Sequence, residues 1–217
     1  MGRVAQPARA GRRPAWLLAG LAAAALATAG LALGGVLWPG YDPVAQTVSE
    51  LVARGAPHRA ALIGVFVVYN ALLIGFGRGL QRRARACGPG GAWGVRGGGR
   101  VVALGALGLA LLALPKDPTG AARTAVGTAH LVLAGGMAAL SAAAALSCGL
   151  WWRTQPGCGR LSALSLACGG AAVALAAATG VAMAYGVAAG LFERLLIGSY
   201  LVWMGAVSYE LGVKNEA

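Results

Sequence analysis

Long apolar runs are the feature of this 217-residue sequence that most restricts its fold. Several of them are as long as the roughly 20 residues that a helix needs to cross a bilayer. The chain is 58% hydrophobic and 11% charged, whereas an ordinary soluble domain has about 25% charged residues. A soluble protein of this length could not bury so much apolar surface, and the mean hydropathy is +0.70. The sequence therefore predicts an integral membrane protein.

Six apolar runs predict six transmembrane helices, at residues 15–38, 60–80, 101–114, 124–150, 161–185 and 191–213. The first run is too long for the apolar part of a cleavable signal peptide. The run 101–114 is short unless the three glycines at 97–99 belong to it, and a re-entrant segment is the alternative. Alanine and glycine dominate the runs and favour close helix packing. We predict an all-α fold, an integral membrane bundle of six transmembrane helices. It forms one domain over residues 15–213, with short tails at 1–14 and 214–217.

The distribution of basic residues predicts the orientation of this bundle. If both termini are cytoplasmic, 13 of the 18 basic residues lie on the inner side, which is the bias that positive-inside topology produces. The inner residues are Arg3, Arg9, Arg12, Arg13, Arg78, Arg82, Arg83, Arg85, Arg96, Arg100, Arg153, Arg160 and Lys214; the outer ones are Arg54, Arg59, Lys116, Arg123 and Arg194. We therefore expect a multi-pass protein of the cell membrane with both termini cytoplasmic.

The net charge of +12 does not predict nucleic-acid binding. No basic segment carries the interleaved aromatic residues on which bases stack. The four cysteines show no CxxC spacing, and a buried free cysteine behaves as a small hydrophobe. We expect no disulfide framework, no metal and no cofactor.

The first outer connection is the most polar stretch between two apolar runs, YDPVAQTVSELVARGAPHR at residues 41–59. Asp42 suits a helix N-cap and Pro43 a first helical position. The sequence thus predicts a short amphipathic helix over residues 43–54 at the outer surface. Its polar face would carry Glu50 and Arg54, with Ser49 beside them. The plainer alternative is an interfacial helix with a solvated pair between Glu50 and Arg54.

A second group of polar residues lies in LPKDPTGAARTAVGTAH, before and within the fourth run. Residues 117–120 suit a type I turn, which is one explanation for Asp117. Arg123 and His130 fall on one face of the following helix, so that the histidine lies inside the span. A histidine at that depth faces protein or a wet cavity. A hydrogen-bonded core histidine is the alternative to a functional one.

The third group opens the last run, in FERLLIGSYLVW. Glu193 and Arg194 point about 100° apart on a helix, so at least one of them should face the bundle. Tyr200 lies on the same stripe as Glu193, with Trp203 beside it. The three groups together predict the rim of an outward-opening cavity, because ionisable residues in spans are costly and count as functional candidates.

These residues resemble those of a known family. YDPVAQTVSELVARGAP, LPKDPTG…GTAH and FERLLIGSYLVW are similar to the small six-helix bacterial membrane proteins grouped as DUF998, over about residues 38–203. The resemblance implies the six-helix architecture and the importance of six residues. They are Ser49, Glu50, Asp117, His130, Glu193 and Arg194. It implies no substrate.

The first functional hypothesis is an intramembrane acid/base enzyme acting on an isoprenoid or other lipophilic substrate. The candidate catalytic residues are Glu50, Asp117, His130 and Glu193; the candidate substrate-binding residues are Tyr41, Ser49, Arg54, Arg123, Arg194, Tyr200 and Trp203. A carboxyl group in apolar surroundings can stay protonated and protonate an alkene or epoxide, while aromatic faces stabilise the resulting cation. Small membrane-integral terpene cyclases are similar in plan. In this hypothesis Glu50 or Asp117 gives the proton, and Tyr41, Tyr200 and Trp203 face the cation.

Three other hypotheses remain open. A metal-dependent lipid hydrolase would use the four candidate catalytic residues as ligands, but a single reachable histidine is weak support for zinc. A non-catalytic protein that binds, moves or senses a lipid would hold an anionic headgroup with Arg54, Arg59 and Arg123. A partner subunit would use the polar rim for docking.

Overall fold

The structure, a computed structural model, describes residues 15–118 and 121–212. Those residues form six α-helices, and each is long and apolar enough to cross a membrane. The helices are α1 (Ala15–Val36), α2 (Arg59–Arg85), α3 (Ala92–Leu112), α4 (Ala125–Arg153), α5 (Gly159–Tyr185) and α6 (Ala189–Gly212). Two short 3-10 helices, η1 (Val48–Val52) and η2 (Gly88–Gly91), lie in the first and second connections, and the described part contains no strand. The predicted all-α bundle is confirmed.

The short third run belongs to a full-length helix, so the re-entrant alternative is wrong. Helix α3 begins at Ala92 and includes all three glycines of the GGG stretch. These glycines are small where neighbouring helices approach closely. A Cβ on Gly98 would lie 2.7 Å from the carbonyl oxygen of Gly77 in α2, and one on Gly97 would lie 2.5 Å from Sγ of Cys148 in α4. The glycines that made the run look short are therefore helix-packing positions.

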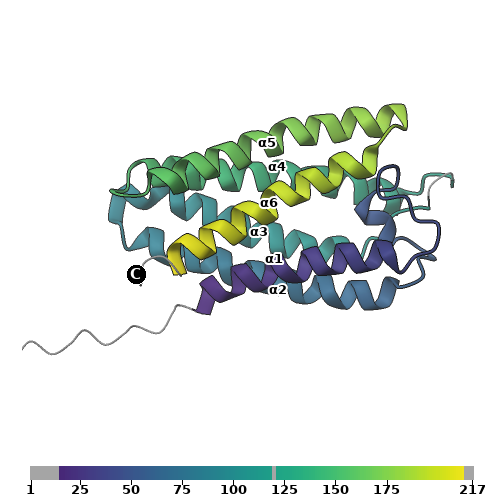
Figure 1. Cartoon of the computed structure of the whole chain (residues 1–217), viewed down its shortest axis with the longest axis horizontal. Coiled ribbons are helices and arrows are strands. Elements are labelled where there is room, and N and C mark those ends of the chain that lie inside the picture. Colours follow the sequence, from purple (N-terminus) through teal and green to yellow (C-terminus); the bar gives the residue numbers. More distant parts are fainter. Residues whose placement is uncertain (1–14, 119–120, 213–217) are drawn as a thin grey trace, which may run out of the picture.

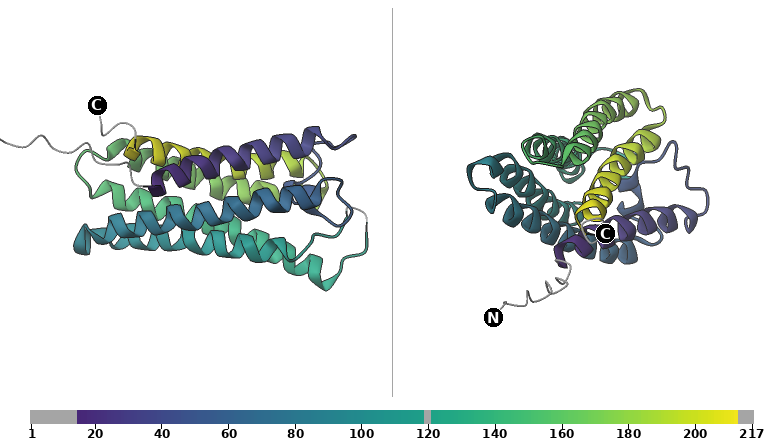
Figure 2. Two further views of the ribbon diagram at one scale, coloured as in Figure 1. Left: turned by 90° about the horizontal axis from the view of Figure 1, so that it is seen from below. Right: turned by 60° about the vertical axis from the view of Figure 1, so that its left-hand side comes forward.

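The helices form an antiparallel ring in which each packs against the next and α6 returns to α1 (Figures 1 and 2). The beginning of α1 and the end of α6 lie at one end of the bundle, on the left in Figure 1. Helix η1 lies at the opposite end, which we call the η1 end. That the η1 end faces outward remains the prediction made from the basic residues.

A short helix does form in the first connection, but it is the 3-10 helix η1, so the predicted bounds 43–54 are too wide. Thr47 has extended backbone angles, and its N–H donates to Oε1 of Glu50 at 3.2 Å. This bond caps a helix that starts one residue later. Ala53 is extended again and Gly55 has a positive φ of 84°, so the helix ends after Val52.

The half of the bundle away from the η1 end has a tightly packed aromatic core. The rings of Phe76 and Trp203 meet edge to face with centroids 6.2 Å apart, and Trp16 packs against Phe76. Trp203 is fully buried and donates from Nε1 to Oγ of Ser165 at 2.9 Å. This core leaves the interior of the η1 half as the place for a cavity.

Several predictions concern residues outside the described part. They are the two tails at 1–14 and 214–217, residue 213 at the end of the last predicted run, and residues 119–120 of the predicted turn.

Candidate functional site

The polar connection before η1 is folded by its own side chains. Oδ1 of Asp42 accepts hydrogen bonds from the backbone N–H groups of Val44 at 2.8 Å and Ala45 at 3.3 Å. Oε1 of Gln46 accepts from the N–H of Asp42 at 2.8 Å. These local bonds replace the first turn of the predicted helix, because aspartate side chains compete well with helix geometry.

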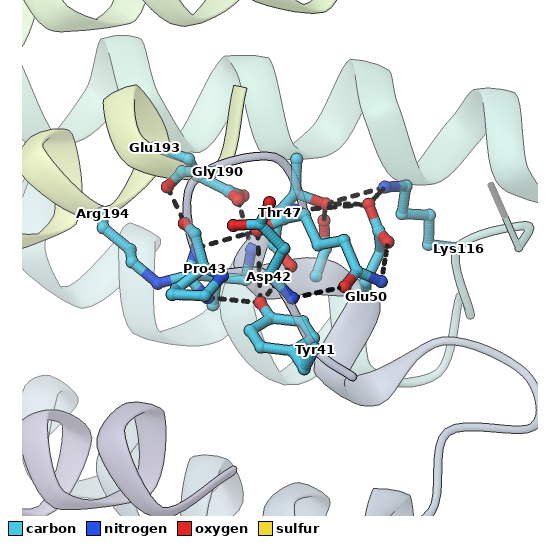
Figure 3. A network of polar contacts seen from close by, with 12 residues as sticks. Tyr41, Asp42, Pro43, Thr47, Glu50, Lys116, Gly190, Glu193 and Arg194 are labelled. Atoms are coloured by element: carbon cyan, nitrogen blue, oxygen red, sulfur yellow. Dashed lines mark hydrogen bonds and ion pairs between the residues drawn. The ribbon is translucent and has the colours of Figure 1, made fainter. Parts of the chain in front are cut away.

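Glu50 and Lys116 form a compact ion pair at the η1 end (Figure 3). Nζ of Lys116 lies 2.9 Å from Oε1 of Glu50 and 2.7 Å from Oγ1 of Thr47. The other carboxylate oxygen of Glu50 accepts from Nε2 of Gln46 at 3.1 Å. The glutamate side chain is 8% exposed and the lysine side chain 13%, so the pair is largely removed from water. The solvated pair between Glu50 and Arg54 is therefore not what forms.

The surroundings of Glu50 keep it ionised. Burial raises the pKa of this carboxyl, but the hydrogen bond and charge of Lys116, with the hydrogen bonds of Gln46 and Thr47, outweigh burial. The pKa of Glu50 consequently lies below its ordinary value. A group that is ionised at neutral pH is poorly suited to protonate an alkene.

Helix α6 holds the connection in place through neighbouring residues that point in different directions (Figure 3). Arg194 donates from Nη1 to the carbonyl oxygens of Pro43 and Gln46, both at 2.8 Å, and from Nη2 to the hydroxyl of Tyr41. Oε2 of Glu193 accepts from the N–H of Val48, the first residue of η1, at 2.5 Å. The guanidinium of Arg194 thus ties the first connection to α6 through two backbone carbonyls and the hydroxyl of Tyr41.

Tyr41 is a structural partner of Arg194. Its ring lies under the guanidinium, 5.3 Å from Cζ, and stacks on Trp38. Burial raises the pKa of its hydroxyl, and Arg194 opposes that rise. The hydroxyl donates to the carbonyl oxygen of Thr47 at 2.9 Å. These contacts anchor the first connection to α6.

Asp117 holds Thr124, the N-cap residue of α4. Its Oδ2 accepts from the N–H of Thr124 at 2.8 Å and its Oδ1 from the hydroxyl of Thr124 at 2.9 Å. The same hydroxyl accepts from the N–H of Gly127 at 3.0 Å. A Cβ on Gly127 would lie 1.9 Å from Oδ2 of Asp117, so glycine makes room for the carboxylate. The hydrogen bonds from Thr124 hold the pKa of Asp117 below its ordinary value, and the charges of Arg54 and Arg123 act in the same direction.

His130 is buried in α4 with one ring nitrogen fixed. It is 1% exposed, and Nδ1 lies 2.5 Å from the carbonyl oxygen of Leu114. A carbonyl oxygen only accepts, so Nδ1 carries the hydrogen, and the lone pair of the neutral ring is on Nε2. Nε2 has no hydrogen-bond partner among the described residues. This arrangement orients an imidazole and leaves its basic nitrogen available.

His130 lines a central cavity of about 210 Å³ in the η1 half of the bundle. Residues of η1 and of every membrane helix except α5 line it, and most of them are apolar. The polar lining residues are Ser49, Tyr69, Asn70, His130, Ser141, Glu193 and Tyr200. A mostly apolar pocket with a few polar groups is the usual form of a small-molecule site.

A second, more polar cavity of about 400 Å³ lies at the same end. It is lined by residues including Gln46, Thr47, Glu50, Lys116, Asp117 and Arg123. Its charged residues have both signs, and Glu50 already neutralises Lys116. The candidate acids are thus divided between two cavities: Glu193 lines the central one, and Glu50 and Asp117 line the polar one.

The other candidate residues lie in different surroundings. Ser49 and Tyr200 line the central cavity. Arg54 and Arg123 are exposed, and Arg59 donates to the carbonyl oxygen of Val52 at 3.1 Å. Within the described part, no group of three or more His, Cys, Asp or Glu side chains could hold a metal ion.

Sequence reasoning missed Lys116 and Asn70 as members of these sites. Lys116 was counted only as an outer basic residue, although it lies beside Asp117 in LPKDP. Asn70 interrupts the apolar stretch FVVYNALL, and a polar residue within a span is itself a signal of function.

The fold and the central cavity define a protein of the multi-pass membrane type with an internal, mostly apolar cavity. The profile of one family, described as protein of unknown function (DUF998), matches residues 7–210. The chain belongs to this family. No curated protein and no solved structure matches it.

Proposed function

We propose that the protein is an intramembrane acid/base enzyme that acts on a small lipophilic substrate in the central cavity. The observation that carries the proposal is His130, a buried histidine that lines an apolar cavity together with Glu193. Its Nδ1 is held by Leu114 and its Nε2 lacks a partner in the described part of the chain. A general base needs such an oriented ring with one nitrogen left for the substrate.

In this proposal Glu193 gives a proton and His130 takes one. Protonated Glu193 adds its proton to an alkene or epoxide of the substrate, which produces a carbocation or its equivalent. Nε2 of His130 then removes a proton from a neighbouring carbon, and the electron pair of that C–H bond forms a new alkene. The proton returns from His130 to Glu193, so the reaction is an isomerisation or cyclisation without net consumption of acid.

The roles of the other candidate acids follow from their partners. Glu50 is ionised by Lys116 and Asp117 caps α4 through Thr124. In the proposal both residues support the η1 end and neither transfers a proton. The role as proton donor, which the sequence suggested for Glu50 or Asp117, passes to Glu193.

Proton-initiated isoprenoid chemistry is the most concrete version of the proposal. Phe66, Tyr69 and Tyr200 line the cavity, and aromatic faces stabilise cations. Trp203 belongs to the packed core and Tyr41 to the α6 anchor, so neither faces a substrate in this version. The cavity is smaller than the roughly 300–1,000 Å³ of drug-sized pockets, which favours a small substrate or one end of a longer isoprenoid.

The test compares products formed by matched variants. Purified wild type, Glu193→Gln and His130→Gln, in membranes of the same lipid, are incubated with isoprenoid alkenes, epoxides and phospholipids, and products are identified by mass spectrometry. Glutamine at 193 keeps an acceptor for the N–H of Val48 but cannot donate a proton as an acid. We expect a product from wild type that both variants lose.

Glu210→Gln is the matched control, because it makes the same change near the other end of α6. It should form product like wild type. Equal product from Glu193→Gln and wild type would rule out the proposed acid.

A second candidate function is non-catalytic binding of a lipophilic molecule in the same cavity. The mostly apolar lining favours it. To test it, bulk is added to the cavity with Ala134→Phe, and the matched control Ala139→Phe adds it at an exposed position of α4. Loss of a co-purified molecule in Ala134→Phe alone, with no product from wild type on any substrate, would favour binding over catalysis.

A further inference from the structure

The central cavity contains two polar atoms that the proposed chemistry does not use, Oδ1 of Asn70 and the hydroxyl of Tyr200. Asn70 in α2 and Tyr200 in α6 both line the cavity, and they are 4% and 6% exposed. Oδ1 of Asn70 and the hydroxyl of Tyr200 have no hydrogen-bond partner among the described residues. Buried polar atoms without partners cost stability, so each calls for an explanation.

The amide of Asn70 has a fixed orientation. The atom that faces the carbonyl oxygen of Phe66, 2.7 Å away, has to be the donor Nδ2. The acceptor Oδ1 is then the atom left without a partner. Gly108 in α3 provides the space for it, since a Cβ there would lie 2.1 Å from Oδ1. The residue thus presents a hydrogen-bond acceptor at a position set by two neighbouring helices.

The cavity contains two acceptors, Nε2 of His130 and Oδ1 of Asn70, and a backbone carbonyl fixes the orientation of each side chain. A backbone carbonyl holds the N–H side of His130, and another holds the N–H side of Asn70. Both side chains are therefore left with an unpartnered acceptor, whereas the phenol of Tyr200 can donate. A carboxylate or phosphate on the ligand could not donate to these two acceptors, and only the Tyr200 hydroxyl could donate to it. Its charge would also be buried at a cost in free energy.

We propose that the substrate is a small lipophilic alcohol, a proposal that rests on the function proposed above. Its hydroxyl donates to Oδ1 of Asn70 and accepts from the hydroxyl of Tyr200, so that one neutral group satisfies both orphaned atoms. The rest of the molecule fills the apolar space toward Glu193 and His130. The cavity of about 210 Å³ has room for about seven groups of the size of a water molecule, at about 30 Å³ each.

Two isomers provide a matched pair of probes. 1-Hexanol and methyl pentyl ether have the same atoms, and only the alcohol can donate a hydrogen bond. Binding to the purified full chain in detergent is measured from the rise in melting temperature, with free probe concentration determined by headspace gas chromatography. We expect the alcohol to bind wild type about tenfold more tightly than the ether, because the ether leaves the buried acceptor unpaired.

Variants test whether Asn70 and Tyr200 cause the tighter binding of the alcohol. In Asn70→Leu the ratio of the two affinities should fall to about one, mainly through weaker binding of the alcohol. Tyr200→Phe removes only the hydroxyl, keeps the shape of the ring and should reduce the ratio as well, which provides a test if Asn70→Leu does not fold. Ser162→Ala is the control, because this buried serine donates to the carbonyl oxygen of Gly149 away from the cavity and should leave the ratio unchanged.

The possible results separate this inference from the proposed function. Equal binding of alcohol and ether to wild type, or an unchanged affinity ratio in both cavity variants, overturns the proposal that the substrate is an alcohol. The proposed binding of a lipophilic molecule in the cavity would be unaffected by that result. Binding of neither probe overturns both. Preferential binding of hexanoate, tested beside them, would also overturn the inference, since a carboxylate cannot donate to Asn70.

Discussion

At the scale of single residues, the pair of Glu50 and Lys116 offers a direct test of how the η1 end is stabilised. Glu50→Gln removes one partner of a nearly buried ion pair and leaves the ammonium of Lys116 without its charge partner. We expect a loss of about 1–3 kcal/mol in unfolding free energy. Thermal melting in detergent measures it, and Arg54→Gln, an exposed change in the same connection, should have little effect. If adding Lys116→Met to Glu50→Gln recovers no stability, the pair is not the cause.

The same pair predicts a pH dependence. The folded-state pKa of Glu50 is below its ordinary value of 4.5. Its stabilising contribution is therefore complete above about pH 4.5 and is lost as the pH falls through the lower folded-state value. Wild type should lose melting temperature more steeply than Glu50→Gln on acidification below about pH 5. Parallel curves for the two proteins would contradict this assignment.

Asp117 is expected to contribute to stability rather than to chemistry. Asp117→Ala removes the acceptor of two hydrogen bonds from Thr124, the N-cap residue of α4, so the start of α4 should become less stable. The melting temperature should fall while product formation by the folded protein continues. A complete loss of turnover in a folded Asp117→Ala protein would return this residue to the catalytic group.

At the scale of elements, the seating of the first connection on α6 depends on a glycine. A Cβ on Gly190 would lie 2.0 Å from the carbonyl oxygen of Gln46. Gly190→Ala should therefore displace the segment that ends in η1, lower the melting temperature and speed tryptic cleavage after Arg54. Gly198→Ala is the matched control in the same helix, because nothing lies within 4 Å of its added Cβ. It should be neutral or stabilise by up to about 1 kcal/mol. Similar behaviour of the two variants would refute the contact.

The sequence predicted the membrane helices better than the connections, for a physical reason. A run of about 20 apolar residues has few alternatives to a membrane helix, so five of the six spans were clear. The run 101–114 looked short because GGG and two flanking arginines lower the local hydropathy, although those glycines belong to α3 and face α2 and α4. The segment 43–54 had helical spacing, but the capping by Glu50 that makes the helix start only at Val48 depends on one side-chain conformation.

The site was predictable as a set of polar residues and not as an arrangement. Periodicity placed His130 on an inward face, but it could not separate Glu193, beside the central cavity, from Glu50, beside Lys116. Which carboxylate meets which cation is decided by contacts between residues far apart in the chain. Asn70 was not predicted, because the apolar residues around it were interpreted only as part of a membrane span.

At the scale of the whole molecule, the distribution of basic residues predicts which side the η1 end faces. A membrane-impermeant thiol reagent applied to intact cells should label Val44→Cys, an exposed position of the first connection. It should label Cys87, which is exposed at the opposite end, only after the membrane is permeabilised. The reverse pattern would mean that the termini are not cytoplasmic.

The aromatic core behind the central cavity has a consequence for what this protein can do across a membrane. Phe76, Trp203 and Trp16 fill the half of the bundle that the cavity does not reach. We infer that the described bundle has no path from one face to the other, so a molecule enters and leaves by the same leaflet. The protein would then act on a molecule of one leaflet. Vectorial flux of the ligand in reconstituted vesicles would disprove this.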